Sequence, residues 1–191
     1  MSTSQIIIGL VGEPSGGKDA AADYLVKKYD FVHVSTGDLV RDYIVKNNLG
    51  NLSRKNLKIV ATKLREQFGS DYLANTALHN TKANMVVISG LRTVAEVHSL
   101  QLKKAIILCV NADIKTRYQR AKIRGRIGEN IDFETLKRIQ DNEEKNMDPN
   151  GQNVEAVISI ADESIQNNGT IEQLHAQIDE FMTQLNKRVQ Q

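Results

Sequence analysis

The chain has 191 residues, of which 40% are hydrophobic and 25% are charged, and its formal net charge is +2. This length can bury the core of one domain, and the single cysteine, Cys109, excludes a disulfide scaffold. The small net charge gives no reason to expect nucleic acid or an anionic membrane as a partner. The first apolar run, Ile6–Val11, is too short to span a bilayer and follows no basic segment. We therefore expect a soluble, cytoplasmic protein.

Short apolar runs alternate with amphipathic segments of helical length along the chain. Strands are predicted at Ile6–Val11, Phe31–Ser35, Met85–Ser89 and Ala105–Val110. Helices are predicted at Lys18–Tyr29, Asp38–Lys46, from Ser53 to Gly69, and at Asp71–His79, Val94–Leu100, Asp113–Arg124, Asp132–Met147 and Thr170–Leu185. Val154–Ile165 fits a strand, or a short helix before a strand at Ser164–Asn167. The alternation predicts an α/β sandwich with a mostly parallel sheet.

The helices between the second and third predicted strands are too many for one crossover connection. We therefore expect residues 36–81 to form a helical insert beside the sheet, within a single domain that spans residues 1–191. Such an insert is placed to bind a substrate or to act as a lid.

The strongest chemical motif is Gly-Glu-Pro-Ser-Gly-Gly-Lys-Asp at residues 12–19, between the first predicted strand and the first predicted helix. It matches the phosphate-binding loop G-x-x-x-x-G-K-[ST] except at its last position. Glycines let backbone N–H groups surround phosphate oxygens, and the lysine bridges the β- and γ-phosphates. The alternative is a glycine-rich turn that binds nothing, but its place in the chain favours the phosphate loop. ATP phosphates would then be bound by Gly12, Ser15, Gly16, Gly17, Lys18, Asp19 and Ala20.

Asp19 stands where the motif has a serine or threonine that binds magnesium. A carboxylate can also hold this hard cation, directly or through water. Alternatively, Asp19 acts only as an acidic residue that stabilises the first turn of the helix, an effect of roughly 0.3–1 kcal/mol. The metal role is the favoured interpretation.

Further segments resemble nucleoside monophosphate kinases. Residues 34–41, Val-Ser-Thr-Gly-Asp-Leu-Val-Arg, resemble the Ser-Thr-Gly-Asp-x-x-Arg segment of adenylate kinases, and residues 89–93, Ser-Gly-Leu-Arg-Thr, resemble their Asp-Gly-Phe-Pro-Arg-Thr segment. Residues 117–126 resemble their arginine-bearing lid. The phosphate loop also looks like that of deoxynucleoside monophosphate kinases, and residues 161–170 are similar to a C-terminal segment of dephospho-CoA kinases. The resemblance spans nearly the whole chain, but only the phosphate loop and the Ser-Thr-Gly-Asp segment are specific.

This resemblance implies a three-layer P-loop sandwich whose five-stranded sheet has the order 2-3-1-4-5. It implies that Thr36, Arg41 and Arg92 bind the phosphate-bearing acceptor, because arginine suits bidentate contact with phosphate oxygens. Residues 117–130 would form a lid over ATP with Arg120 and Arg126. Phosphoryl transfer would depend on four cationic residues: Lys18, Arg92, Arg117 and Arg124. Ordinary solvated helix surfaces are the alternative for the arginines.

One departure from the resembled family concerns the metal. Ser89 ends the third predicted strand, where these kinases carry an aspartate that helps to hold magnesium. The paired substitution suggests that the anionic partner of the metal has moved to Asp19, with Asp38 as a second candidate.

The expected reaction is transfer of the ATP γ-phosphoryl group to a nucleoside or deoxynucleoside monophosphate, with Mg²⁺. Partners would be small-molecule nucleotides, without nucleic acid or a membrane, and no pattern indicates the oligomeric state. The alternatives are a dephospho-CoA kinase-like enzyme and a nucleotide-binding switch with weak NTPase activity. Cys109 reads as a core residue, and neither His33 nor His98 has a recognisable serine or cysteine partner. The acidic group Asp141, Glu143 and Glu144 reads as solvated helix surface.

Overall fold

Five parallel strands form the central sheet of the computed structural model, which describes residues 5–125, 132–135, 137, 148 and 150–189. The strands are β1 (Ile6–Val11), β2 (Val32–Ser35), β3 (Met85–Ser89), β4 (Ile106–Asn111) and β5 (Glu163–Gln166). Their order is β2-β3-β1-β4-β5, and every neighbouring pair is parallel. The predicted sheet and strand order are therefore confirmed. The ambiguous segment holds a short helix followed by a strand.

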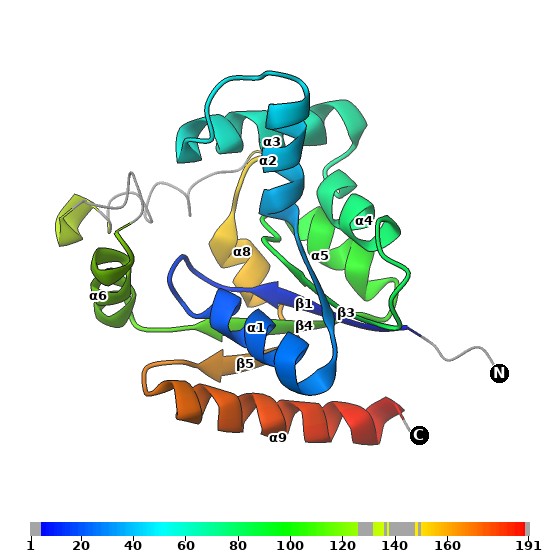
Figure 1. The fold of residues 1–191 in the computed structure, drawn as a ribbon, viewed down its shortest axis with the longest axis vertical. Coiled ribbons are helices and arrows are strands. Elements are labelled where there is room, and N and C mark those ends of the chain that lie inside the picture. Colours follow the sequence, from blue (N-terminus) through cyan, green and yellow to red (C-terminus); the bar gives the residue numbers. More distant parts are fainter. Residues whose placement is uncertain (1–4, 126–131, 136, 138–147, 149, 190–191) are drawn as a thin grey trace.

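Helices cover both faces of the sheet, as a parallel sheet requires. One face carries α1 (Lys18–Tyr29) and α9 (Ile171–Val189), and the other carries α4 (Tyr72–His79), α5 (Val94–Gln101) and α8 (Val154–Ser159) (Figure 1). The remaining helices are α2 (Thr36–Lys46), α3 (Arg54–Phe68) and α6 (Ile114–Arg124). Arg126, Asp141, Glu143 and Glu144, with most of the predicted helix Asp132–Met147, lie outside the described residues.

The core has two halves because alternate side chains of each strand point to opposite faces. In β1, Ile8 and Leu10 pack against α1 and α9, whereas Ile7 and Val11 pack on the side of α4 and α5. Cys109 is buried in the second half, which confirms that it is a core residue. In the described part of the chain, no helix is both long and apolar enough to cross a membrane.

The helices α2, α3 and α4 share a smaller core of their own. Val40 and Ile44 of α2 pack there with Val60 and Leu64 of α3 and with Leu73 of α4. Helix α2 begins directly at the carboxyl end of β2, where the Ser35 side chain accepts a hydrogen bond from the backbone of Asp38. This cap starts α2 two residues earlier than predicted and places the helices beside the end of the sheet where α/β proteins bind ligands.

Candidate phosphate-binding site

The loop between β1 and α1 has a backbone that requires glycine at two positions. Gly12 and Gly17 have φ angles of 136° and 114°, which side chains rarely adopt. A Cβ atom at Gly12 would collide with the carbonyl oxygen of Val110, and one at Gly17 would collide with the side chain of Asn167. The loop is therefore seated tightly on the ends of β4 and β5.

Lys18 lies at the start of α1 with its ammonium group inside the loop. Its Nζ donates hydrogen bonds to the carbonyl oxygens of Gly12, at 2.6 Å, and Glu13, at 2.8 Å. Burial, followed by repulsion from Arg92, lowers the pKa of Lys18 to about 7, although Asp19 and Glu13 act in the opposite direction. A polyanion bound in the loop would raise this pKa again, so the lysine's charge is coupled to the ligand.

Asn167 braces the loop from the end of β5. Its buried side chain donates a hydrogen bond from Nδ2 to the Gly16 carbonyl oxygen over 3.0 Å, and its backbone N–H donates to the Asn111 carbonyl oxygen over 2.7 Å. The residue belongs to the segment that resembles dephospho-CoA kinases, but its contact with the phosphate loop could not be predicted. It positions the loop without lining the pocket.

A pocket of about 670 Å³ extends from the phosphate loop to α2 and α3. Five of the predicted phosphate-binding residues line it: Ser15, Gly17, Lys18, Asp19 and Ala20. The other two, Gly12 and Gly16, do not. The pocket is strongly cationic, because eight lysines and arginines line it against two acids, Asp19 and Asp38. The eight are Lys18, Arg41, Arg54, Lys58, Arg65, Arg92, Arg120 and Arg124. It therefore suits a ligand with several negative charges.

The three predicted arginines of α6 do not share one environment. Arg124 donates a hydrogen bond from Nη2 to the Ser15 hydroxyl over 3.1 Å, and Arg120 lines the pocket beside Asn167. Arg117 is 5% exposed and is absent from the pocket lining. Its Nε donates to the Ala112 carbonyl oxygen over 2.9 Å, and its Nη1 lies 3.7 Å from Oε2 of Glu13. Its position is under the phosphate loop, where it supports Glu13.

The predicted acceptor-binding residues come together at the ends of β2 and β3. The Thr36 hydroxyl donates to the Gly90 carbonyl oxygen over 2.8 Å, while Arg41 and Arg92 line the pocket nearby. Arg41 Nη1 lies 2.5 Å from Oδ1 of Asp38, one helical turn before it. Asp38, the second candidate for the metal, is therefore engaged by an arginine.

His33 and Ser89 form a pair that the sequence interpretation denied. The Nε2 atom of His33 on β2 lies 2.8 Å from Oγ of Ser89 on β3, and both residues line the pocket. The interpretation that His33 has no serine partner is wrong. The pair could have been predicted from the expected strand order, in which the second and third strands are neighbours, because both residues lie near the ends of these strands.

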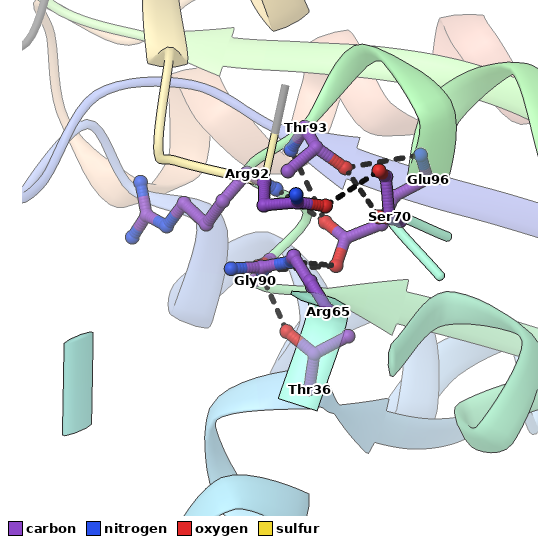
Figure 2. A network of polar contacts seen from close by, with 8 residues as sticks. Thr36, Arg65, Ser70, Gly90, Arg92, Thr93 and Glu96 are labelled. Carbon is purple, nitrogen blue, oxygen red and sulfur yellow. Dashed lines mark hydrogen bonds and ion pairs between the residues drawn. The ribbon is translucent and has the colours of Figure 1, made fainter. Parts of the chain in front are cut away.

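Arg65 and Glu96 form a second pair, which no spacing in the sequence indicated. Arg65 of α3 donates from Nε to Oε1 of Glu96 on α5 over 2.9 Å, and Nη2 lies at the same distance from that oxygen. Both side chains are almost fully buried, and Arg65 borders the pocket. Figure 2 shows the Glu96 carboxylate between Arg65 and the backbone of Arg92 and Thr93.

Asp19 is the acidic residue best placed for a cation. It is exposed in the first turn of α1 and lines the pocket next to Lys18. Within the described ranges, no group of three or more histidine, cysteine, aspartate or glutamate residues could enclose a metal ion. The protein therefore offers a cation one exposed carboxylate, which fits an ion that is also held by a nucleotide and water.

The chain has clear relatives and structural neighbours. A family model described as an AAA domain matches residues 11–137. UPF0200 protein MMP1282 of Methanococcus maripaludis is 33% identical over 85% of this chain and 88% of its own length. UPF0200 protein MJ1399 of Methanocaldococcus jannaschii is 29% identical over 94% of this chain and 90% of its own length.

Two solved structures share the fold at low sequence identity. TT1252 from Thermus thermophilus has a TM-score of 0.62 and 18% identity and covers 95% of this chain and 98% of its own. Shikimate kinase from Acinetobacter baumannii, in complex with shikimate, has a TM-score of 0.56 and 14% identity and covers 95% of both chains. The chain therefore belongs to the family of this AAA domain and to the UPF0200 proteins, and it has a P-loop kinase-like fold.

Proposed function

We propose that the protein transfers the γ-phosphoryl group of ATP to a small phosphate-bearing acceptor, most simply a nucleoside or deoxynucleoside monophosphate. One observation carries the proposal: a single cationic pocket joins Lys18 and the phosphate loop to Thr36, Arg41 and Arg92 at the strand ends. A donor and an acceptor that occupy its two ends would meet between them. Alignment of the two substrates is the main catalytic requirement of phosphoryl transfer.

The residues around the phosphate loop have distinct proposed roles. Lys18 would leave the loop carbonyl groups and contact the β- and γ-phosphates, while Arg120 and Arg124 would neutralise charge on the transferred group. Arg117 would act indirectly, by holding Glu13 and thus the shape of the loop. Arg126 keeps its proposed place in a lid formed by residues 117–130.

Asp19 would hold Mg²⁺ on the donor side, directly or through water. Bound there, Mg²⁺ supplies positive charge to the phosphate oxygens. Asp38 remains the second candidate, and one of its oxygens is paired with Arg41. On the acceptor side, Thr36 and the Ser89–His33 pair line the pocket and offer polar contacts.

An acceptor screen tests the proposal. ADP production is measured with ATP and Mg²⁺ against a panel of ribo- and deoxyribonucleoside monophosphates, their unphosphorylated nucleosides and dephospho-CoA. We expect acceptor-dependent ADP production with at least one monophosphate, and its loss in Lys18→Ala. A response to dephospho-CoA alone would identify the other kinase class. ATP turnover that no acceptor changes would instead support a nucleotide-binding switch and contradict the proposal.

A further inference from the structure

The buried pair of Arg65 and Glu96 lies between the helical insert and the sheet. Arg65 is 2% exposed and Glu96 is fully buried, yet they come from α3 and α5 and are 31 residues apart in the chain. Two hydrogen-bonding nitrogens of Arg65 point to one carboxylate oxygen, each over 2.9 Å. Charge neutralisation within the pair explains how both groups tolerate burial, but buried ion pairs give little stability beyond that of apolar packing.

The third nitrogen of the Arg65 guanidinium is the informative one. Among the residues that the structure describes, no atom accepts a hydrogen bond from Nη1 of Arg65. Buried donors of charged groups are rarely left in this state, because the loss of hydration is not repaid. Arg65 borders the pocket, so an oxyanion in the pocket is the natural acceptor for this N–H group.

A second arginine repeats this feature at the donor end of the same pocket. Nη1 of Arg120 is also buried without a partner in the described part of the chain, and Arg120 lies beside Asn167, which braces the phosphate loop. Three buried side-chain atoms are unpaired across the described residues, and two of them belong to arginines that line this pocket. Their placement at both ends fits a pocket for two anionic ligands.

Glu96 connects Arg65 to the other acceptor-side arginine. Its Oε2 accepts hydrogen bonds from the backbone N–H groups of Arg92, at 2.7 Å, and Thr93, at 3.2 Å, while Oε1 holds Arg65. The Arg92 side chain extends away from this network (Figure 2). One buried carboxylate therefore holds the guanidinium group of Arg65 and also the backbone from which the Arg92 side chain extends.

We propose that Arg65 binds the anionic group of the acceptor through Nη1, with Glu96 as the positioning residue that fixes Arg65 and the Arg92 segment. The inference rests on the proposed phosphoryl transfer and adds a location to it, since it places the anionic group of the acceptor, a phosphate or a carboxylate, at the α3 side of the pocket. Because Glu96 neutralises the charge of Arg65, this contact would select among acceptors by the geometry of their hydrogen bond to Nη1 and not by net charge. Other basic residues, among them Arg54, Lys58 and Arg92, also line the pocket.

Nuclear magnetic resonance of the arginine side chains tests the contact without requiring turnover. The full-length protein, saturated with a non-hydrolysable ATP analogue, is titrated with inorganic phosphate and, separately, with acetate. The Nε–Hε signal of Arg65 is assigned by its loss in Arg65→Lys. We expect a saturable shift of this signal with phosphate, and the acetate arm shows whether a carboxylate also binds. No shift in either arm would overturn the proposal, even if the enzyme proves to be a kinase.

Kinetics with the acceptor found in the screen give a second test. The variant R65Q/E96Q removes both charges together and keeps a side chain that can accept from the Arg92 and Thr93 backbone. We expect it to raise KM for the acceptor about tenfold or more, with KM for ATP unchanged within about twofold. The matched control R188Q/E163Q removes a surface pair, 2.7 Å apart and outside the pocket lining, and should leave both KM values unchanged.

The outcomes separate the two proposals. A folded R65Q/E96Q protein with an unchanged acceptor KM overturns the role of Arg65 but leaves phosphoryl transfer intact. Absence of transfer to every acceptor in the wild-type protein overturns the proposed function, while the phosphate titration still decides whether Arg65 binds an oxyanion. If R65Q/E96Q does not fold, Arg65→Lys takes its place, because it retains the charge and loses the forked geometry.

Discussion

The two ends of the pocket are built in different ways. At the donor end, consecutive residues of one loop supply the site, and their carbonyl groups and glycine φ angles define it. At the acceptor end, side chains from α2, α3 and the segment after β3 converge, and the buried carboxylate of Glu96 holds part of them in place. The first end depends on local backbone geometry, and the second depends on tertiary packing, so they should respond differently to mutation.

The largest effect on stability should come from Glu96→Ala. This change leaves Arg65 buried without a counter-charge and removes the capping box of α5, in which the Glu96 side chain binds the Thr93 backbone. We expect a loss of about 3–5 kcal/mol in the free energy of unfolding, measured with urea. Glu163→Ala, which breaks the exposed pair with Arg188, should cost about 0–1 kcal/mol. Equal costs would show that the acceptor end does not depend on its buried pair.

Gly12→Ala should disable the donor end with a smaller cost in stability. The added Cβ would collide with the Val110 carbonyl oxygen at a φ of 136°, so the loop must move, at about 1–3 kcal/mol. We expect binding of an ATP analogue, measured by calorimetry, to be lost. Gly50→Ala is the matched control, because Gly50 also has a positive φ, of 94°, but its Cβ position meets only an ordinary contact with Asn56, and the residue is outside the pocket lining. Normal binding by Gly12→Ala would contradict this account of the loop.

Proton uptake should accompany nucleotide binding. The pKa of Lys18 is about 7 before binding, so at about pH 8 the lysine is mostly neutral, and a triphosphate beside it restores the charge. Binding then takes up close to one proton, and affinity falls as the pH rises above about 7. Calorimetry in buffers of different ionisation enthalpy measures this uptake, which Lys18→Met should abolish. Equal uptake by both proteins would assign the proton to another group.

The smallest effect expected is that of Asp19→Ser, which restores the usual residue of the motif. If Asp19 holds the metal, the magnesium dependence of ATP affinity changes in Asp19→Ser and is weaker still in Asp19→Ala. If it only stabilises the first turn of α1, both variants lose about 0.3–1 kcal/mol of stability. Titration of Mg²⁺ at fixed ATP distinguishes the two cases, and an unchanged magnesium dependence in both variants rejects the relocation of the metal partner.

The same contrast explains what the sequence could predict. Apolar periodicity predicts the strands, and the resemblance to nucleoside monophosphate kinases implies their order in the sheet. The phosphate loop follows from a motif whose residues are adjacent in the chain. The resemblance implied that Arg117 takes part in phosphoryl transfer, but packing places Arg117 against Glu13, away from the pocket lining. The pairing of Arg65 with Glu96 depends on how α3 packs against α5, and no local sequence pattern predicts that packing.

Replacement of Lys18 by alanine tests the central claim most directly, because the claim is that the loop between β1 and α1 holds a nucleoside triphosphate. Calorimetric titration with ATP and Mg²⁺ should show binding by the wild-type protein and an affinity lower by about 100-fold or more in Lys18→Ala. Acceptor-dependent ADP production should fall with it. An Lys18→Ala protein that binds and turns over ATP like the wild type would contradict the account.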